Sequence, residues 1–423
     1  MADTRDDRRP TVFEILRPGF LKLDRLWEER PMKRHYDVVI IGGGIHGLAT
    51  AYYLAKNHGV EDIAVLEKNY IGFGGSGRNT AIVRANQRTR ENVRLYDEGL
   101  KLWPDLTDEL DFNLMFFNCG NLNLAHSEAA LSSFRLSINT ANFCGVKSEL
   151  LDRESCKELI PALDVSDRPR LPILGGMYHP PGGVLRHDAV VWGLAKGASA
   201  HGASIQQGVG VSAIDTDAGH VTGVQTNKGP ITCNKLAIMA GGYGAAVCAM
   251  LDIELPIHPL TIQAMVTQPL KPFLNHVISS GGYHIYANQT LKGEIACGAH
   301  MDPQVNYTTD ATAWYFKHQA EAMVELLPCL ERVRFLRIWA GLADMTPDMA
   351  PILEGNLEFD GLYLDCGWGY FGFKSGPVTG KYMAEYIARE ERPDILGPFT
   401  LDRFLRNRYM GETATTMKYG HYD

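Results

Sequence analysis

Residues 36–47 carry the strongest structural signal of the chain and read Tyr36-Asp-Val-Val-Ile-Ile-Gly-Gly-Gly-Ile-His-Gly47. The first six of these residues form a β-rich apolar run that is typical of a buried parallel strand. The glycines that follow have the spacing G-x-G-x-x-G, in which Gly42 allows a tight turn and Gly44 lets the backbone approach a pyrophosphate. Gly47 lets a helix pack closely on the strand, and we expect that helix over residues 48–55. The N-terminus of that helix would offer free N–H groups and the positive end of its dipole to phosphates.

A second strand completes a βαβ unit. Residues 61–67 (EDIAVLE) are β-rich and end in Glu67, twenty residues after Gly47. At that place an acidic side chain binds the ribose hydroxyls of a dinucleotide, and an acid rather than an arginine disfavours the 2′-phosphate of NADP. With both strands and the acid in place, the unit predicts a dinucleotide site. The plainer alternative is a glycine turn that serves only strand–helix packing.

The rest of the chain does not continue as a series of βα units, as a nicotinamide-binding domain usually does. A glycine-rich loop at 72–84 follows instead, and strands run into glycine-rich turns again at 235–244 and 361–374. Residues 95–170 have a largely helical pattern, whereas residues 255–345 alternate apolar and polar side chains as half-buried antiparallel strands do. We therefore expect two interwoven domains.

The composition is that of an ordinary soluble globular protein. The 423 residues are 45 % hydrophobic and 21 % charged, which excludes a disordered, collagen-like or disulfide-stapled chain. The net charge of −8 and the lack of a Lys/Arg cluster with interleaved aromatics argue against a nucleic-acid partner. The eight cysteines show no C-x-x-C pair, so we expect reduced thiols and no metal centre. A charged start without an apolar h-region, and apolar runs too short to cross a bilayer, predict a cytoplasmic protein without a membrane span.

The first 34 residues form an N-terminal arm with an unusual pattern. Its apolar residues recur at roughly helical spacing, and Pro18-Gly19 interrupts the run. The apolar residues are Val12, Phe13, Leu16, Phe20, Leu23 and Trp27. The arm packs on its own domain in one interpretation and docks on a partner subunit in the other.

Five motifs resemble a known family. They are Tyr36–Lys56, Arg78–Arg84 (RNTAIVR), Gly120–His126 (GNLNLAH), Gly182–Val190 (GGVLRHDAV) and Cys366–Gly369 (CGWG). Together they are similar to the β subunit of heterotetrameric sarcosine oxidase and to the related subunit of N-methylglutamate dehydrogenases. Both belong to the glycine oxidase/D-amino-acid oxidase superfamily of FAD enzymes. The resemblance covers about Tyr36 to Arg403, nearly the whole chain.

The resemblance implies an α/β fold. In it, a Rossmann-like FAD-binding domain of the glutathione-reductase type is interleaved with a substrate domain built on a mostly antiparallel sheet. The expected ranges are 1–34 for the N-terminal arm, 35–95, 170–250 and 345–402 for the FAD-binding domain, 96–169 and 251–344 for the substrate or cap domain, and 403–423 for a C-terminal tail.

The same resemblance assigns residues to FAD. Gly42, Gly44, Gly47 and Glu67 match the pyrophosphate and ribose positions. Residues in the later loops match positions near the adenine and the flavin ring: Arg78, Thr80, Val211, Gly241, Gly369, Gly372 and Phe373.

Four side chains match substrate positions of the family. Arg84 and Lys374 match the two cations that hold the substrate carboxylate in sarcosine-oxidising members. Such a clamp suits amine oxidation, because hydride transfer to flavin needs the C–H bond held in line rather than a strong base. Tyr286 and His300 match a tyrosine and a histidine near the substrate. The alternatives are a surface or phosphate contact for Arg84, a solvated loop lysine for Lys374, and satisfied core residues for the other two.

Two departures from relatives bear on the cofactor. Monomeric sarcosine oxidases tether FAD through a cysteine shortly before a Thr-Pro-Asp motif, and here that position is Gly341, before Thr346-Pro-Asp348. Dimethylglycine dehydrogenases use a histidine in the first glycine loop, and residues 76–80 contain none. We therefore expect non-covalent FAD. Ala296 stands where monomeric oxidases carry a lysine that helps reduced flavin meet oxygen, which leaves a dehydrogenase open.

The segment around His187 resembles the segment around a histidine that carries covalent FMN in the heterotetrameric enzymes. That FMN takes electrons from FAD at a subunit interface. A neutral imidazole nitrogen can attack the flavin methyl position, which a cation could not. The alternative is a histidine at a helix start, capped by Asp188.

The resemblance implies oxidation of a secondary N-methyl amino acid such as sarcosine to an imine, with partner subunits. A first alternative is an N-methylglutamate or other N-methyl-amino-acid dehydrogenase with a non-oxygen acceptor. A glycine or D-amino-acid oxidase acting alone is a second. An alternative of another class is an assembly subunit that holds FAD without catalysis of its own.

Overall fold

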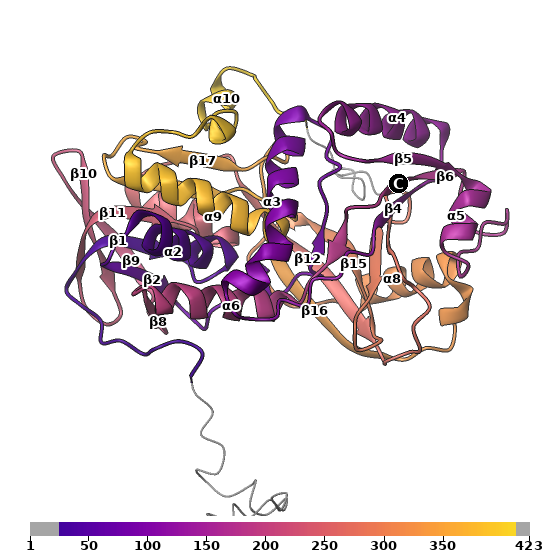
Figure 1. Cartoon of the computed structure of the whole chain (residues 1–423), viewed down its shortest axis with the longest axis horizontal. Helices are drawn as coiled ribbons and strands as arrows, with labels where there is room; N and C mark the ends of the chain where they lie inside the picture. Colours follow the sequence, from indigo (N-terminus) through magenta and orange to yellow (C-terminus); the bar gives the residue numbers. More distant parts are fainter. Residues whose placement is uncertain (1–24, 412–423) are drawn as a thin grey trace, which may run out of the picture.

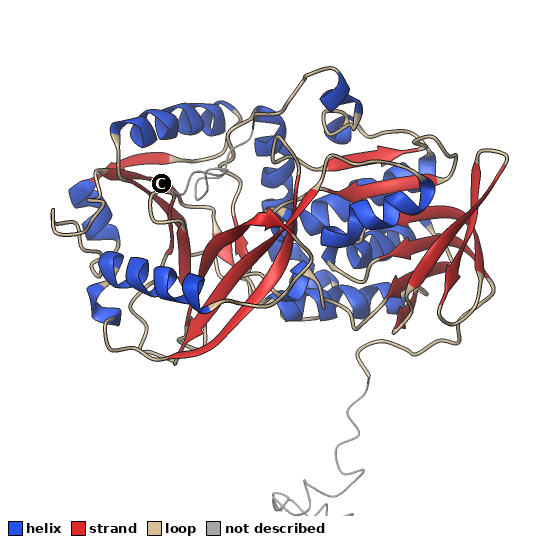
Figure 2. Cartoon of the chain, turned by 180° about the vertical axis from the view of Figure 1, so that it is seen from behind, coloured by secondary structure: helices blue, strands red, loops and turns tan. Residues whose placement is uncertain are grey.

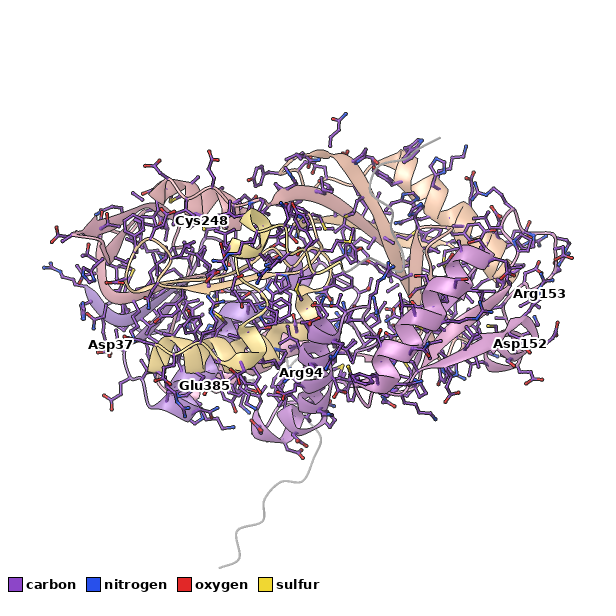
Figure 3. The ribbon with its side chains drawn as sticks, turned by 90° about the horizontal axis from the view of Figure 1, so that it is seen from above. Asp37, Arg94, Asp152, Arg153, Cys248 and Glu385 are labelled. Carbon is purple, nitrogen blue, oxygen red and sulfur yellow. The ribbon has the colours of Figure 1, made fainter. Side chains whose placement is uncertain are left out.

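The computed structural model describes residues 25–411, and the predicted apolar run before Arg25 lies outside this range. Two large sheets lie side by side along the long axis of the molecule (Figure 1). In the view from above, Asp37 of the first sheet and Asp152 of the second lie towards opposite ends (Figure 3). The α/β fold, with one largely parallel and one mostly antiparallel sheet, is the fold expected from the sequence.

The first sheet is built around β1 (His35–Ile41), which pairs in parallel with β2 (Ile63–Glu67) and β11 (Ile231–Ile238). The sheet is extended by β8 (Ser204–Gln207), β18 (Leu362–Cys366), β17 (Ile352–Gly355), β9 (Val211–Asp217) and β10 (His220–Thr226). All of residues 38–41 are buried, because helices and loops cover both faces of the central strand. This explains the uninterrupted apolar run in the sequence.

Three helices pack together on one face of the first sheet: α2 (Ile45–His58), α6 (His187–Ala200) and α9 (Gly372–Arg389) (Figure 1). The backbones of α2 and α9 approach closely, since a Cβ atom added at Gly380 would lie only 2.4 Å from Cβ of Ala49. Because α2 follows β1 and α9 follows the parallel strand β18, both helices begin at the same edge of the sheet. That edge is where α/β sheets bind ligands.

The second sheet has the order β16-β12-β15-β14-β13-β4-β6-β5. Its strands are β16 (Phe335–Met345), β12 (His258–Thr267), β15 (Ile295–Val305), β14 (Ile285–Gln289), β13 (Val277–Ser280), β4 (Asn121–Ala125), β6 (Gly175–His179) and β5 (Glu149–Asp152). The view from behind shows its long twisted strands (Figure 2). Helix α8 (Ala313–Leu326) packs against this sheet, with Met323 and Leu326 in a shared apolar core.

The structure differs from the expected domain boundaries at two places. Strand β6 pairs with β4 and β5 in the second sheet, although residues 170–250 were expected in the FAD-binding part. Helix α3 (Arg90–Glu109), expected in the substrate part from residue 96, packs against α9 of the first. The reason is its apolar face: Trp103 is fully buried and stacks on Phe373 with ring centroids 6.1 Å apart.

The remaining elements are short or peripheral. They are β3 (Ile82–Val83), which pairs with β7 (Gly183–Val184), and α4 (Glu128–Phe143), α5 (Arg153–Leu159), α7 (Gly244–Cys248) and α10 (Asp402–Leu405). Within residues 25–411, none of the helices has the length and apolar character needed to cross a membrane.

Candidate functional site

A cavity of about 610 Å³ lies where the edge of the first sheet faces the second. The first sheet contributes the turn after β1, the end of β2 and the loop before α9. The second contributes residues of β12, β13, β14 and β16, among them Ser279 and Tyr286. The cavity therefore has one wall of glycine-rich turns and one wall of strand side chains.

The turn after β1 has the geometry that its glycines predict. Gly42 has a φ of 121°, and a Cβ atom there would lie 2.3 Å from the carbonyl oxygen of Met239. A Cβ atom at Gly47 would lie 2.0 Å from the carbonyl oxygen of Gly42. Gly42 and Gly44 line the cavity, whereas Gly47 lies in the packing between turn and helix. Ile45, the first residue of α2, donates its N–H to Oγ of Ser76 at 2.9 Å.

Glu67 holds the turn from the neighbouring strand. Its carboxylate accepts the N–H of Gly43 at 3.0 Å and that of Asn69 at 2.9 Å. Val211, at the start of β9, and Gly241, in the turn after β11, line the cavity beside it. A Cβ atom at Gly241 would meet no protein atom within 4 Å, so that turn borders open space.

The glycine-rich loop after β2 joins the two sheets. Arg78 donates from Nε to the carbonyl oxygen of Phe73 at 2.9 Å and from Nη1 to that of Ala340 at 2.8 Å. Trp339 of β16 donates its indole N–H to the carbonyl oxygen of Arg78 at 2.7 Å. Both Arg78 and Thr80 line the cavity, so this loop crosses it from one sheet to the other.

Two buried cations line the same cavity. Arg84 follows β3, and Lys374 is the third residue of α9; each side chain is 8 % exposed. Both stand over the ring of Phe371, with Cζ of Arg84 5.7 Å and Nζ of Lys374 5.0 Å from its centroid. Burial lowers the pKa of Lys374 well below its usual value, and the charge of Arg84 lowers it further. A bound anion would relieve this repulsion, so the pair suits a carboxylate.

Tyr286 and His300 lie in different surroundings. Tyr286 lines the cavity, and its hydroxyl forms a hydrogen bond with that of Thr80; burial raises its pKa to about 12. His300 is not among the cavity-lining residues of the described chain. It is buried beside the rings of Tyr315 and His284, and burial lowers its pKa to about 4. The structure thus brings Tyr286, but not His300, to the cavity wall.

The loop before α9 closes one end of the cavity. Gly369, Gly372 and Phe373 all line it, and Gly369 has a φ of 57°, which favours glycine. The N–H of Gly369 donates to the carbonyl oxygen of Asp344 at 3.0 Å. This bond ties the loop that leads into α9, and so towards Lys374, to β16 of the second sheet.

Sequence reasoning missed a group of polar residues on the cavity wall, namely His46, Asp344, Asp365 and Trp368. His46 lies inside the glycine motif, where attention falls on the glycines. The carboxylates lie in strands that read as ordinary core or sheet. No local signal joins His46 to the others, because its bond with Asp365 spans 319 positions of the sequence.

His187 lies just outside the cavity, as the first residue of α6. It is half-buried and has a hydrogen bond with the backbone of Gly77. The neighbours of that glycine, Ser76 and Arg78, line the cavity. Burial lowers the pKa of His187, which favours the neutral ring. The carboxylate of Asp188 accepts hydrogen bonds from Arg186 and also, at 2.9 Å, from the N–H of Ala189 in the first turn of α6.

The residues fit a dinucleotide cofactor of the FAD type. Gly44 and Gly241 keep side chains out of the cradle, the first turn of α2 presents N–H groups to it, and Glu67 stands at the ribose end. The cavity lining within residues 25–411 includes no cysteine, and its one histidine, His46, has both ring nitrogens engaged. Within the same residues, no group of three His, Cys, Asp or Glu side chains could hold a metal ion.

Comparison with known proteins gives the following similarities. Residues 37–386 match the family described as DAO, FAD dependent oxidoreductase. The chain is 42 % identical to sarcosine oxidase subunit beta of Rhizobium meliloti (strain 1021), over 91 % of this chain and 92 % of that protein. It is 39 % identical to the corresponding subunit of an Arthrobacter species, over 90 % and 93 %. L-proline dehydrogenase from P. horikoshii superposes with a TM-score of 0.83 at 28 % identity, over 89 % of this chain and 99 % of that one.

Proposed function

The chain belongs to the DAO family of FAD-dependent oxidoreductases and, within it, to the sarcosine oxidase β subunits, and we propose that it oxidises sarcosine or a similar secondary N-methyl amino acid to an imine. The observation that carries this proposal is the buried pair Arg84 and Lys374 on the wall of the cofactor cavity. The two positive charges lie over one ring on the cavity wall, and the α-carboxylate of an amino acid bound beside them would offset their mutual repulsion.

The chain's own residues would bind and orient the substrate. Arg84 and Lys374 would hold its carboxylate, which fixes the adjoining C–N unit in the cavity. Tyr286, held by Thr80, would border the amine side as a neutral phenol. When bound, FAD would accept a hydride equivalent from a carbon next to the nitrogen of the unprotonated amine. The nitrogen lone pair would form the C=N bond as the hydride leaves, and the protonated imine would lose its N–H proton to water.

FAD would be held without a covalent bond. Gly42, Gly44 and the first turn of α2 would hold the pyrophosphate, with Gly47 allowing the helix to approach. Glu67 would bind the ribose. The adenine and flavin ends would lie along the remaining lining residues: Arg78, Thr80, Val211, Gly241, Gly369, Gly372 and Phe373. Support for a free cofactor comes from the cavity lining, which has no cysteine among the described residues.

The test is reduction of the bound flavin. Purified holoenzyme is mixed with sarcosine without oxygen, and the oxidised flavin absorbance is followed by stopped flow. Bleaching without added partner subunits is the expected result. An assembly subunit without catalysis would stay yellow with sarcosine, with N-methylglutamate and with glycine, and that outcome would remove the proposal.

A covalent FMN on His187 would carry the electrons onward. The support is the position of His187: one hydrogen bond joins it to Gly77, whose two neighbours line the FAD cavity, and its ring is kept neutral by burial. Partner subunits would complete this site. The elements beside His187 carry exposed apolar side chains, Trp192 on α6 and Leu336 on β16, which a partner could cover.

Acid precipitation tests the FMN. The protein made with its partner subunits is denatured in acid, and peptide mapping shows where yellow flavin remains. FMN on the His187 peptide with FAD released is expected. Release of all flavin from this preparation, or retention of flavin on another peptide, would contradict the assignment. His201→Asn, in the residue after α6, serves as a matched control that keeps the flavin.

A dehydrogenase that uses a non-oxygen acceptor is the second candidate. The observation that favours it is Ala296, buried on β15, at the position where monomeric oxidases carry a lysine. Hydrogen peroxide formation is compared with reduction of an artificial dye under the same substrate concentration. Dye reduction at least about tenfold faster than peroxide formation would identify the dehydrogenase.

A further inference from the structure

His46 occupies an unusual position for a histidine. It is the second residue of α2, it lies on the cavity wall, and both of its ring nitrogens face oxygen atoms. Nδ1 lies 3.0 Å from Oδ2 of Asp365, and Nε2 lies 2.9 Å from the carbonyl oxygen of Gly372. A neutral imidazole has one N–H, and a backbone carbonyl can only accept a hydrogen bond. Nε2 therefore carries a proton and donates it to the carbonyl oxygen of Gly372, and a second proton lies between Nδ1 and Asp365.

The carboxylate of Asp365 lies where it can accept a hydrogen bond from Nδ1 of His46. Its other carboxylate oxygen accepts the indole N–H of Trp368. Both oxygens of this carboxylate are therefore engaged, one by Trp368 and the other by His46. The ring of Trp368 also packs on that of His46, with centroids 4.8 Å apart, which fixes the plane of the imidazole.

We propose that His46 is held as an imidazolium and acts as a positioning residue, which ties the N-terminus of α9 to that of α2 and so sets Lys374 against the FAD site. Gly372 is the first residue of α9, and Lys374 follows it by two positions. The carbonyl oxygen of Gly372 accepts one hydrogen bond from the His46 ring and another, at 2.9 Å, from Oγ of Ser375. His46 thereby links the N-terminus of α2, at the cofactor site, to the N-terminus of α9, which carries Lys374.

The charges around His46 agree with this state. The groups that face it are Asp365 and, at greater range, Asp344; burial alone would lower its pKa, but the two carboxylates and the hydrogen bonds raise it above the usual value. Asp344 is itself buried with its pKa raised to about 6, and it accepts the N–H of Gly367 at 2.7 Å. The pKa of His46 is higher in the folded than in the unfolded protein. The stability that its charge contributes to the fold is therefore fully present below the pKa of the unfolded state, and it is lost as pH rises through the pKa of the folded state.

The charge state is tested by NMR on holoenzyme with 15N-labelled histidine. We expect one histidine to show two protonated ring nitrogens at pH 7.5, and that signal to vanish in the His46→Gln variant. His58→Gln, at the far end of the same helix, is the matched control and leaves the signal in place. A signal for His46 with one protonated and one bare nitrogen at this pH would overturn the proposal. If His46→Gln does not fold, Asp365→Asn replaces it, and the same signal should then show a bare nitrogen.

The positioning role is tested on the same variants through FAD affinity and steady-state kinetics. Loss of a charge-assisted bond predicts an FAD dissociation constant and a KM for sarcosine each raised about tenfold or more in His46→Gln, with neither changed in His58→Gln. Unchanged values of both in His46→Gln would overturn the role. The KM arm rests on the proposed carboxylate clamp, whereas the NMR signal and FAD affinity do not. If no amine reduces the flavin, the proposed function fails, but the NMR signal and the FAD affinity still test the inference about His46.

Discussion

At the scale of single residues, Lys374 is a buried cation whose partner is the proposed substrate. Replacing it by methionine keeps an unbranched side chain, one atom shorter, and removes the charge. Loss of a charge-assisted hydrogen bond of about 1.5–3 kcal/mol predicts a KM for sarcosine raised roughly 10- to 100-fold. Lys381→Met, further along α9 and half-buried over Tyr382, is the matched control. Steady-state kinetics with equal FAD content checks this, and equal KM values for the two variants would exclude Lys374 from the clamp.

The lowered pKa of Lys374 also predicts a pH dependence. Burial and Arg84 lower that pKa in the free protein, so the ammonium loses its charge as pH rises through the lowered value. A bound carboxylate favours the charged form, so substrate binding takes up a proton above that pH. We expect KM to rise with pH in this interval. In Lys374→Arg, whose side chain stays charged, the rise should disappear. A KM that rises equally in both proteins would assign the effect to another group.

At the scale of elements, the contact of β1 and α2 depends on Gly47. A Cβ atom there would meet the carbonyl oxygen of Gly42 at 2.0 Å, so Gly47→Ala must displace either the turn or the helix. We expect FAD affinity to fall about tenfold or more, with a lower melting temperature. Ala55→Gly in the same helix loses helix propensity, about 1 kcal/mol, and one buried methyl group, but it leaves the turn untouched and should keep its FAD. Flavin content after gel filtration and thermal unfolding check this. Full flavin content in Gly47→Ala would show that the turn adapts.

At the scale of the whole molecule, the cavity has walls from both sheets, so its ligand joins them. Removing FAD should lower the melting temperature, and adding it back should raise it with concentration. At a hundred times the dissociation constant, binding contributes about 2.7 kcal/mol, or roughly a few degrees for a chain of this size. Differential scanning fluorimetry with increasing FAD measures the shift. A melting temperature that does not depend on FAD would mean that the two sheets are held together by protein contacts alone.

Those parts of the fold that have local causes could be predicted from the order of the amino acids. The run 36–47 predicts strand, turn and helix, and the structure has β1, the glycine turn and α2 there. Alternation of polar and apolar residues likewise predicted the antiparallel strands of residues 255–345. Glycine requirements and side-chain periodicity act over a few residues, so they can be recognised without knowing what the segment packs against.

Which distant residues share a cavity could be seen only in the folded chain. It brings Arg84 and Lys374 over one phenylalanine ring, bonds His46 to Asp365 across 319 positions of sequence, and leaves His300 outside the cavity lining. It also turned the apolar face of α3 towards the first sheet, against the boundary that its position in the chain had indicated. A lone charged or aromatic side chain carries no local signal of its partner. Its role follows from burial and charge, and these arise only when the two sheets enclose the same space.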